Sequence, residues 1–216
     1  MYVCQVMGYH PVMAGPATPP VTRPRNVRGE GDRLREQLLE ATVSLLESEG
    51  DAARLSVRAI AKAAGVSPTA LYLQFPDRDT LVSAAVDRGF AAFNETLRSA
   101  AESESEPRAQ LRVTGVAYLN FAESQPALYA VIFSSRRPTR QPTESGAVVR
   151  DEGLKGLIAL VAAIRPSDGQ SEARELALTL WAALHGYATL HARTPVRRWP
   201  KPARYVDRLM RAHLGV

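Results

Sequence analysis

Hydrophobic residues along this chain recur every three or four positions, and no segment keeps a strict alternation of apolar and polar residues. This spacing is that of one face of an α-helix, so the sequence predicts an all-α fold. Residues 32–49 form the first predicted helix, with leucine and alanine along one side. Further apolar stripes predict helices around residues 82–97, 111–121, 127–133, 154–161, 172–191 and 206–213, and a loop over residues 134–146.

Two short helical patterns meet at Gly65 within residues 56–75. Ser56 is suited to cap the first, because its hydroxyl can accept a free backbone N–H of the first turn. Gly65 tolerates the left-handed conformation that ends a helix. Ser67 can cap the second helix and Pro68 fits its first turn. The arrangement is typical of a helix-turn-helix, whose second helix enters the major groove of DNA, although a plain corner between two helices would share these features.

Three predicted domains follow from this organisation. Residues 1–27 are rich in proline, glycine and small side chains and form a flexible arm. Residues 28–80 form a three-helix DNA-binding domain, and residues 81–216 form a helical regulatory and dimerisation domain. The two last predicted helices could pair with a second copy as a four-helix bundle; alternatively, they complete the core of one chain.

Composition narrows the function only slightly. The chain of 216 residues carries a net charge of +5, which suits a polyanionic partner. Its single cysteine fits a reducing cytosol, and no apolar run spans a bilayer, so we expect a cytoplasmic protein without membrane contact. The basic run at residues 193–211 is expected to be a solvated surface rather than a second nucleic-acid site.

The helix-turn-helix segment resembles the TetR family of bacterial transcriptional regulators. The similar residues are Leu38-Leu39-Glu40-Ala41, those from Leu55 to Ala61, Ala64-Gly65-Val66-Ser67, Leu71-Tyr72 and Phe75-Pro76. Gln74 stands where the family usually has His, and Arg78 where it usually has Lys. A second, looser resemblance joins Trp181, His185 and Gly186 to the TetR subgroup whose regulatory domain carries a Trp-xxx-His-Gly signature.

The resemblance implies which residues contact double-stranded DNA. Those facing the bases would be Arg58, Thr69, Ala70, Tyr72 and Leu73, and those holding phosphates would be Ser56, Ser67, Tyr72, Gln74 and Arg78. It also implies a pocket for an unknown small molecule in the regulatory domain. The residues expected near that pocket are Phe90, Phe93, Tyr118, Phe121, Tyr129, Phe133, Trp181 and His185. Aromatic residues at helical spacing are also ordinary core residues, and His185 could be a hydrogen-bonded core histidine.

The leading hypothesis is a homodimeric, TetR-type repressor that binds a palindromic operator and is released by a small-molecule ligand. Two alternatives stay open: a DNA-binding architectural protein without ligand control, and a helical enzyme. The enzyme finds no support in the motifs, because the sequence has no GxSxG, HExxH or P-loop. The four histidines do not have the spacing of metal ligands, so neither a metal nor another cofactor is expected.

Overall fold

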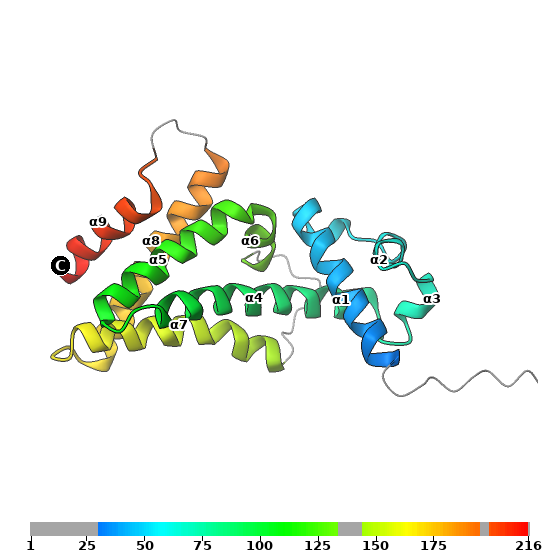
Figure 1. The fold of residues 1–216 in the computed structure, drawn as a ribbon, viewed down its shortest axis with the longest axis horizontal. Coiled ribbons are helices and arrows are strands. Elements are labelled where there is room, and N and C mark those ends of the chain that lie inside the picture. The colour runs from blue at the N-terminus through cyan, green and yellow to red at the C-terminus, as the bar shows by residue number, and fades with distance from the viewer. Residues whose placement is uncertain (1–29, 134–143, 195–198, 216) are drawn as a thin grey trace, which may run out of the picture.

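The computed structural model describes residues 30–133, 144–194 and 199–215. Every regular element within these residues is a helix, which confirms the all-α prediction (Figure 1). None of the described helices is long and apolar enough to cross a membrane. The predicted arm, residues 1–27, lies outside the described residues, as does most of the predicted loop over residues 134–146.

The first four elements gather at one end of the molecule (Figure 1). They are α1 (Glu30–Glu49), the 3-10 helix η1 (Ala52–Arg54), α2 (Val57–Ala63) and α3 (Pro68–Leu71). Their apolar core is shielded from solvent: Leu38, Ile60 and Phe75 are almost completely buried. A small apolar cluster of this kind is sufficient to hold three short helices at fixed angles.

The predicted helix caps of the helix-turn-helix are present. The Ser56 hydroxyl accepts the backbone N–H of Ala59 at 3.1 Å, and the Ser67 hydroxyl accepts that of Ala70 at 3.3 Å. Gly65 lies between them with a φ of 68°, in the left-handed region that favours glycine. The turn between α2 and α3 is therefore set by local chemistry.

α4 (Arg78–Glu102) leaves this end of the molecule and runs through the rest of it, across the domain boundary predicted after residue 80. The Asp77 carboxylate caps α4 by accepting the backbone N–H of Thr80 at 2.7 Å. Hydrogen bonds from Thr80 hold the pKa of Asp77 below its ordinary value. The 25-residue helix α4 therefore contributes to both parts of the molecule.

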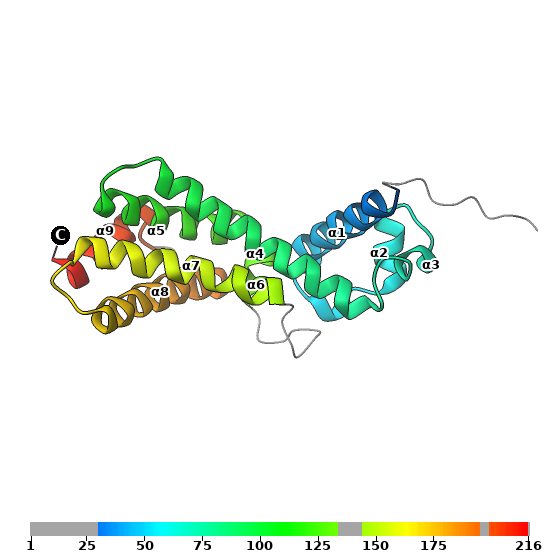
Figure 2. The same ribbon diagram turned by 90° about the horizontal axis from the view of Figure 1, so that it is seen from below.

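The second half of the chain is a bundle of α4 with five further helices. These are α5 (Pro107–Ser124), α6 (Pro126–Ile132), α7 (Glu144–Ile164), α8 (Gln170–Arg193) and α9 (Pro202–Leu214). Seen from below, α4 and α5 form one side, and α7 and α8 form the other (Figure 2). α9 buries its apolar side, including Val206 and Met210, against α5 and α8.

Two glycines allow neighbouring helices to approach α4 closely. A Cβ on Gly89 would lie 2.9 Å from Leu128 of α6, and a Cβ on Gly153 of α7 would lie 2.9 Å from the Asn94 side-chain oxygen. Such distances are shorter than van der Waals contact, so the Leu128 or Asn94 side chain would have to shift to admit a larger residue. Both glycines therefore allow α4 to pack closely against its neighbours.

Some element limits differ from the prediction. The second helix of the motif was expected to continue to residue 75 but ends at Leu71, after which the backbone tightens into bonds such as Gln74 N–H to Leu71 O at 3.0 Å. Pro76 stands directly after Phe75 and has no backbone N–H with which to continue a helix. The predicted loop over residues 134–146 is too long, because α7 already begins at Glu144.

Candidate nucleic-acid interface and internal cavity

The surface formed by α2, α3 and the turn after α3 carries most of the residues predicted to contact DNA. Tyr72 is 55% exposed and Leu73 is 69% exposed. Leu71, the last residue of α3, is fully buried in the core. Arg58 on α2 and Thr69 on α3 are exposed on the same two elements, and Ala70 is half-buried. Tyr72 and Leu73 are adjacent, so two large apolar side chains on this surface are available to a partner.

The two serines of this surface can serve as caps and as phosphate contacts at once. Each hydroxyl oxygen of Ser56 and Ser67 accepts a backbone N–H, and each O–H group remains a donor. Both residues are exposed. Their predicted phosphate contacts are therefore compatible with the geometry.

Arg78, which the resemblance places against a phosphate, binds groups within the chain. Its Nε donates to the carbonyl of Leu55 at 2.6 Å, its Nη2 donates to the carbonyl of Ala52, and its Nη1 pairs with Asp79 at 2.5 Å. The guanidinium thus ties the first turn of α4 to η1 and to Leu55, which follows η1. A planar fork of donors can reach two carbonyls at once, which explains why arginine suits this position.

Gln74, the other departure from the usual family pattern, lies beside the start of α1. Its side chain is half-buried, and its backbone carbonyl accepts a hydrogen bond from Arg35 Nη1 at 3.4 Å. The Arg35 guanidinium also stacks over the Phe75 ring at 4.3 Å. This contact between α1 and the turn after α3 was not predicted, because cation–π pairs between distant residues leave no periodic signal.

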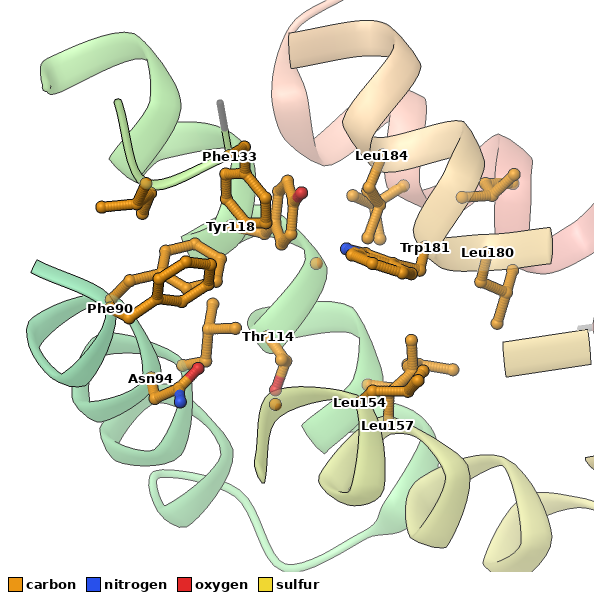
Figure 3. A pocket seen from close by; sticks show the side chains of 18 of the residues that line it. Phe90, Asn94, Thr114, Tyr118, Phe133, Leu154, Leu157, Leu180, Trp181 and Leu184 are labelled. Carbon is orange, nitrogen blue, oxygen red and sulfur yellow. The ribbon is translucent and has the colours of Figure 1, made fainter. Parts of the chain in front are cut away.

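The helical bundle contains a partly open cavity of about 320 Å³ (Figure 3). Residues from all six helices α4 to α9 line it, including Ile132 of α6, together with Phe133 directly after α6. Five of the eight residues predicted near a pocket are on its wall: Phe90, Phe93, Tyr118, Phe133 and Trp181. Figure 3 shows Phe90 and Phe133 on the side opposite Trp181.

The other three predicted residues lie behind this wall. Phe121 packs against the Phe93 ring with centroids 5.1 Å apart. The Tyr129 hydroxyl lies 2.9 Å from the Tyr118 hydroxyl and 2.7 Å from His185 Nδ1. None of the three is among the lining residues, so they support the cavity wall and do not form it.

Burial determines the protonation of this hydrogen-bonded cluster. Desolvation raises the pKa of Tyr118 to about 12 and also raises that of Tyr129. Desolvation lowers the pKa of His185, so the neutral imidazole is favoured. The cluster is uncharged near pH 7. His185 is therefore a neutral, hydrogen-bonded and partly buried histidine.

Models of two protein families match the chain. The model described as "Bacterial regulatory proteins, tetR family" matches residues 38–85, and "Tetracyclin repressor-like, C-terminal domain" matches residues 111–213. The two matches together cover well over half of the chain. The chain belongs to the TetR family. It is accordingly a TetR-type DNA-binding transcriptional regulator.

Solved structures share this fold. A protein of unknown function from Rhodococcus sp. RHA1 is 26% identical, with a TM-score of 0.72 over 90% of this chain and 98% of that one. A TetR family transcription regulator from Marinobacter aquaeolei VT8 is 20% identical, with a TM-score of 0.65 over 86% and 98%. The regulator FadR from Bacillus subtilis, solved with stearoyl-CoA, is 14% identical, with a TM-score of 0.67 over 83% and 97%.

Several cavity residues of this TetR regulator were missed at the level of sequence. Most are aliphatic, such as Leu154 and Leu157, and leucines facing a cavity have the same spacing as leucines in a core. Asn94 and Thr114 did carry a signal, since each is a polar residue within an otherwise apolar helix face. Among the described residues no cluster of three metal-ligating side chains is present.

Proposed function

We propose that this TetR regulator is a homodimeric repressor that binds a palindromic operator and is released when a small molecule occupies the cavity. One observation carries the proposal: α4 begins beside the DNA-contacting elements and supplies Phe90, Phe93 and Asn94 to the cavity wall. Occupancy of the cavity can therefore act on the position of α2 and α3 through a single rigid element.

The proposed operator contacts are made by the exposed residues of α2, α3 and the following turn. Arg58 can donate two hydrogen bonds to guanine O6 and N7, and Thr69 and Leu73 can meet thymine methyl groups. The exposure of all three side chains supports this role. Arg78 is left out of the proposed contacts, since its donors already bind carbonyls within the chain.

The proposed dimer interface is centred on α8. Ala182, Gly186 and Leu190 follow one another at intervals of four and so share a helix face. Ala182 and Leu190 are exposed, and a Cβ on Gly186 would have no atom within 4 Å. Such a stripe of small and apolar residues admits a second helix closely. α9 contributes less apolar area, because its outward residues include Arg204 and Arg208.

Dimerisation follows the symmetry of the proposed DNA site. A homodimer with a twofold axis presents two copies of α3, and a palindrome presents two identical half-sites about 34–36 Å apart. We also propose that the chain belongs to the Trp-xxx-His-Gly subgroup, which Trp181, His185 and Gly186 support. Binding to chromosomal DNA would place the protein in the cytoplasm, with no catalytic activity needed.

Selection of bound sequences from a random DNA library tests the proposal. The purified full chain should enrich an inverted repeat, and sedimentation should show a dimer. Arg58→Ala should weaken binding by about 1–3 kcal/mol at one base position. Lys62 is exposed in the last turn of α2 and could contact a phosphate, so Lys62→Ala should weaken binding to all sequences alike. Binding without any enriched sequence would favour an architectural DNA-binding protein and overturn the proposed repressor.

A further inference from the structure

We propose that the cavity takes a neutral, largely apolar small molecule with one hydrogen-bonding group, and that the Thr114 hydroxyl binds this group. The inference rests on the proposed ligand control and adds the chemical class of the ligand. The cavity volume of about 320 Å³ lies at the lower end of the range for small-molecule sites.

The part of the cavity wall formed by described residues disfavours an ionised ligand. None of the described residues that line it is Asp, Glu, Lys, Arg or His. A carboxylate or ammonium group moved from water into this wall would lose its hydration and find no opposite charge among the described lining residues. A phosphate-bearing carrier such as the stearoyl-CoA of the Bacillus subtilis FadR structure would face the same cost at its charged end.

The polar groups on the wall are few, and most already have partners. The Tyr118 hydroxyl bonds to that of Tyr129 at 2.9 Å and also interacts with Trp181. Asn94 likewise has an interaction within the chain. A ligand therefore meets a mostly apolar surface whose polar atoms are largely occupied.

Thr114 is the exception among the lining residues described here. Its side-chain oxygen is buried, and it has no hydrogen-bond partner in the part of the chain that the structure describes. Figure 3 shows Thr114 on α5, at the side of the cavity nearest Asn94 and α7. A buried hydroxyl without a partner is destabilising, so a ligand atom that bonds to it gains affinity.

The charge requirement is tested on the unaltered full chain with two fluorescent probes of one skeleton. N-phenyl-1-naphthylamine is neutral, and 8-anilinonaphthalene-1-sulfonate adds a sulfonate to the same rings. We expect saturable binding of the neutral probe at about one molecule per chain, and affinity at least roughly tenfold lower for the sulfonate. Octan-1-ol should displace the neutral probe, whereas octanoate at pH 8 should do so at least roughly tenfold less well. Equal affinities within either pair would overturn the proposed ligand class.

The role of Thr114 is tested with an isosteric pair. Thr114→Val removes the hydroxyl and keeps the shape, and Thr114→Ser keeps the hydroxyl. Thr114→Val should lower the affinity for octan-1-ol about fivefold, which corresponds to one net hydrogen bond, and leave that for 1-chlorooctane unchanged. Thr114→Ser should retain most of the preference for the alcohol. An unchanged ratio of the two affinities in Thr114→Val would remove Thr114 from the site.

Two further measurements separate this inference from the proposed function. Leu157→Trp fills the cavity, so it should abolish probe binding while the helical circular dichroism is retained; undiminished binding would show that the probes bind elsewhere and overturn the inference. The charge comparison needs no variant and decides the ligand class even if Leu157→Trp does not fold. The selected operator is then titrated with octan-1-ol present. Release of DNA supports both proposals, whereas ligand binding that leaves DNA affinity unchanged refutes ligand control and leaves the ligand class standing.

Discussion

Replacing Arg78 should destabilise the protein rather than merely weaken its contact with DNA. Arg78→Ala removes the donors to the carbonyls of Leu55 and Ala52, in a segment where both residues are buried. A hydrogen bond from a charged group contributes about 1.5–3 kcal/mol. The Arg78 side chain is 24% exposed, so water can replace part of two such bonds. We expect a loss of about 2–4 kcal/mol in the free energy of unfolding.

Urea denaturation followed by circular dichroism measures this loss, and the melting temperature should fall by roughly 4–16 °C for a chain of this size. Arg78→Lys is the matched control. Lysine keeps the positive charge but has no planar fork, so it should recover about half of the lost stability. A phosphate contact, by contrast, would be recovered almost fully by lysine.

DNA binding distinguishes the two roles independently. If Arg78 bound a phosphate, Arg78→Ala would reduce the slope of log affinity against log salt by about 0.9 for each lost contact. If it binds carbonyls, the slope should stay the same once the fraction of folded protein is taken into account. Unaltered stability together with a reduced slope would refute the internal role of Arg78.

Three further predictions concern the turn and the buried cluster. Gly65→Ala should cost about 1 kcal/mol of stability through its φ of 68° alone, because no atom lies near its Cβ, and Gly65→Asn should cost less; equal melting temperatures would contradict this. The pKa of Tyr118 is raised to about 12, so its contribution to the free energy of unfolding should be complete below pH 10 and fall by about 3 kcal/mol towards pH 12. Alkaline denaturation should show a smaller fall for Tyr118→Phe. Burial lowers the pKa of His185, so its contribution to stability should be present above pH 6.5 and decline as the pH falls further; His185→Gln should flatten this dependence in acid melts.

Local chemistry accounts for the parts of this fold that could be predicted. The caps at Ser56, Ser67 and Asp77 each involve a backbone N–H three residues away, so the sequence contains both partners side by side. The internal role of Arg78 could not be found in this way. Its carbonyl acceptors lie 23 and 26 residues earlier in the chain, and carbonyls are present at every position.

The cavity illustrates a second limit. Phe93 and Phe121 have similar spacing in their helices, yet Phe93 lines the cavity and Phe121 packs behind it. Which of two buried rings faces a void depends on how five or six helices meet, and periodicity in one helix does not contain that information. Polar residues such as Thr114 are the more informative signal, because an apolar helix face rarely retains a hydroxyl without a use.

Asn94 of α4 lies well inside the bundle, beside Gly153 of α7. Arg78 lies sixteen residues earlier on the same helix, or about 24 Å at 1.5 Å per residue. A tilt of about 5° around Asn94 would move the start of α4 by about 2 Å. In a twofold dimer the two displacements add, to about 4 Å against a half-site spacing of about 34–36 Å. The length of the lever arm, more than the strength of any single contact, would then set how sensitively occupancy of a small cavity is converted into loss of register on DNA.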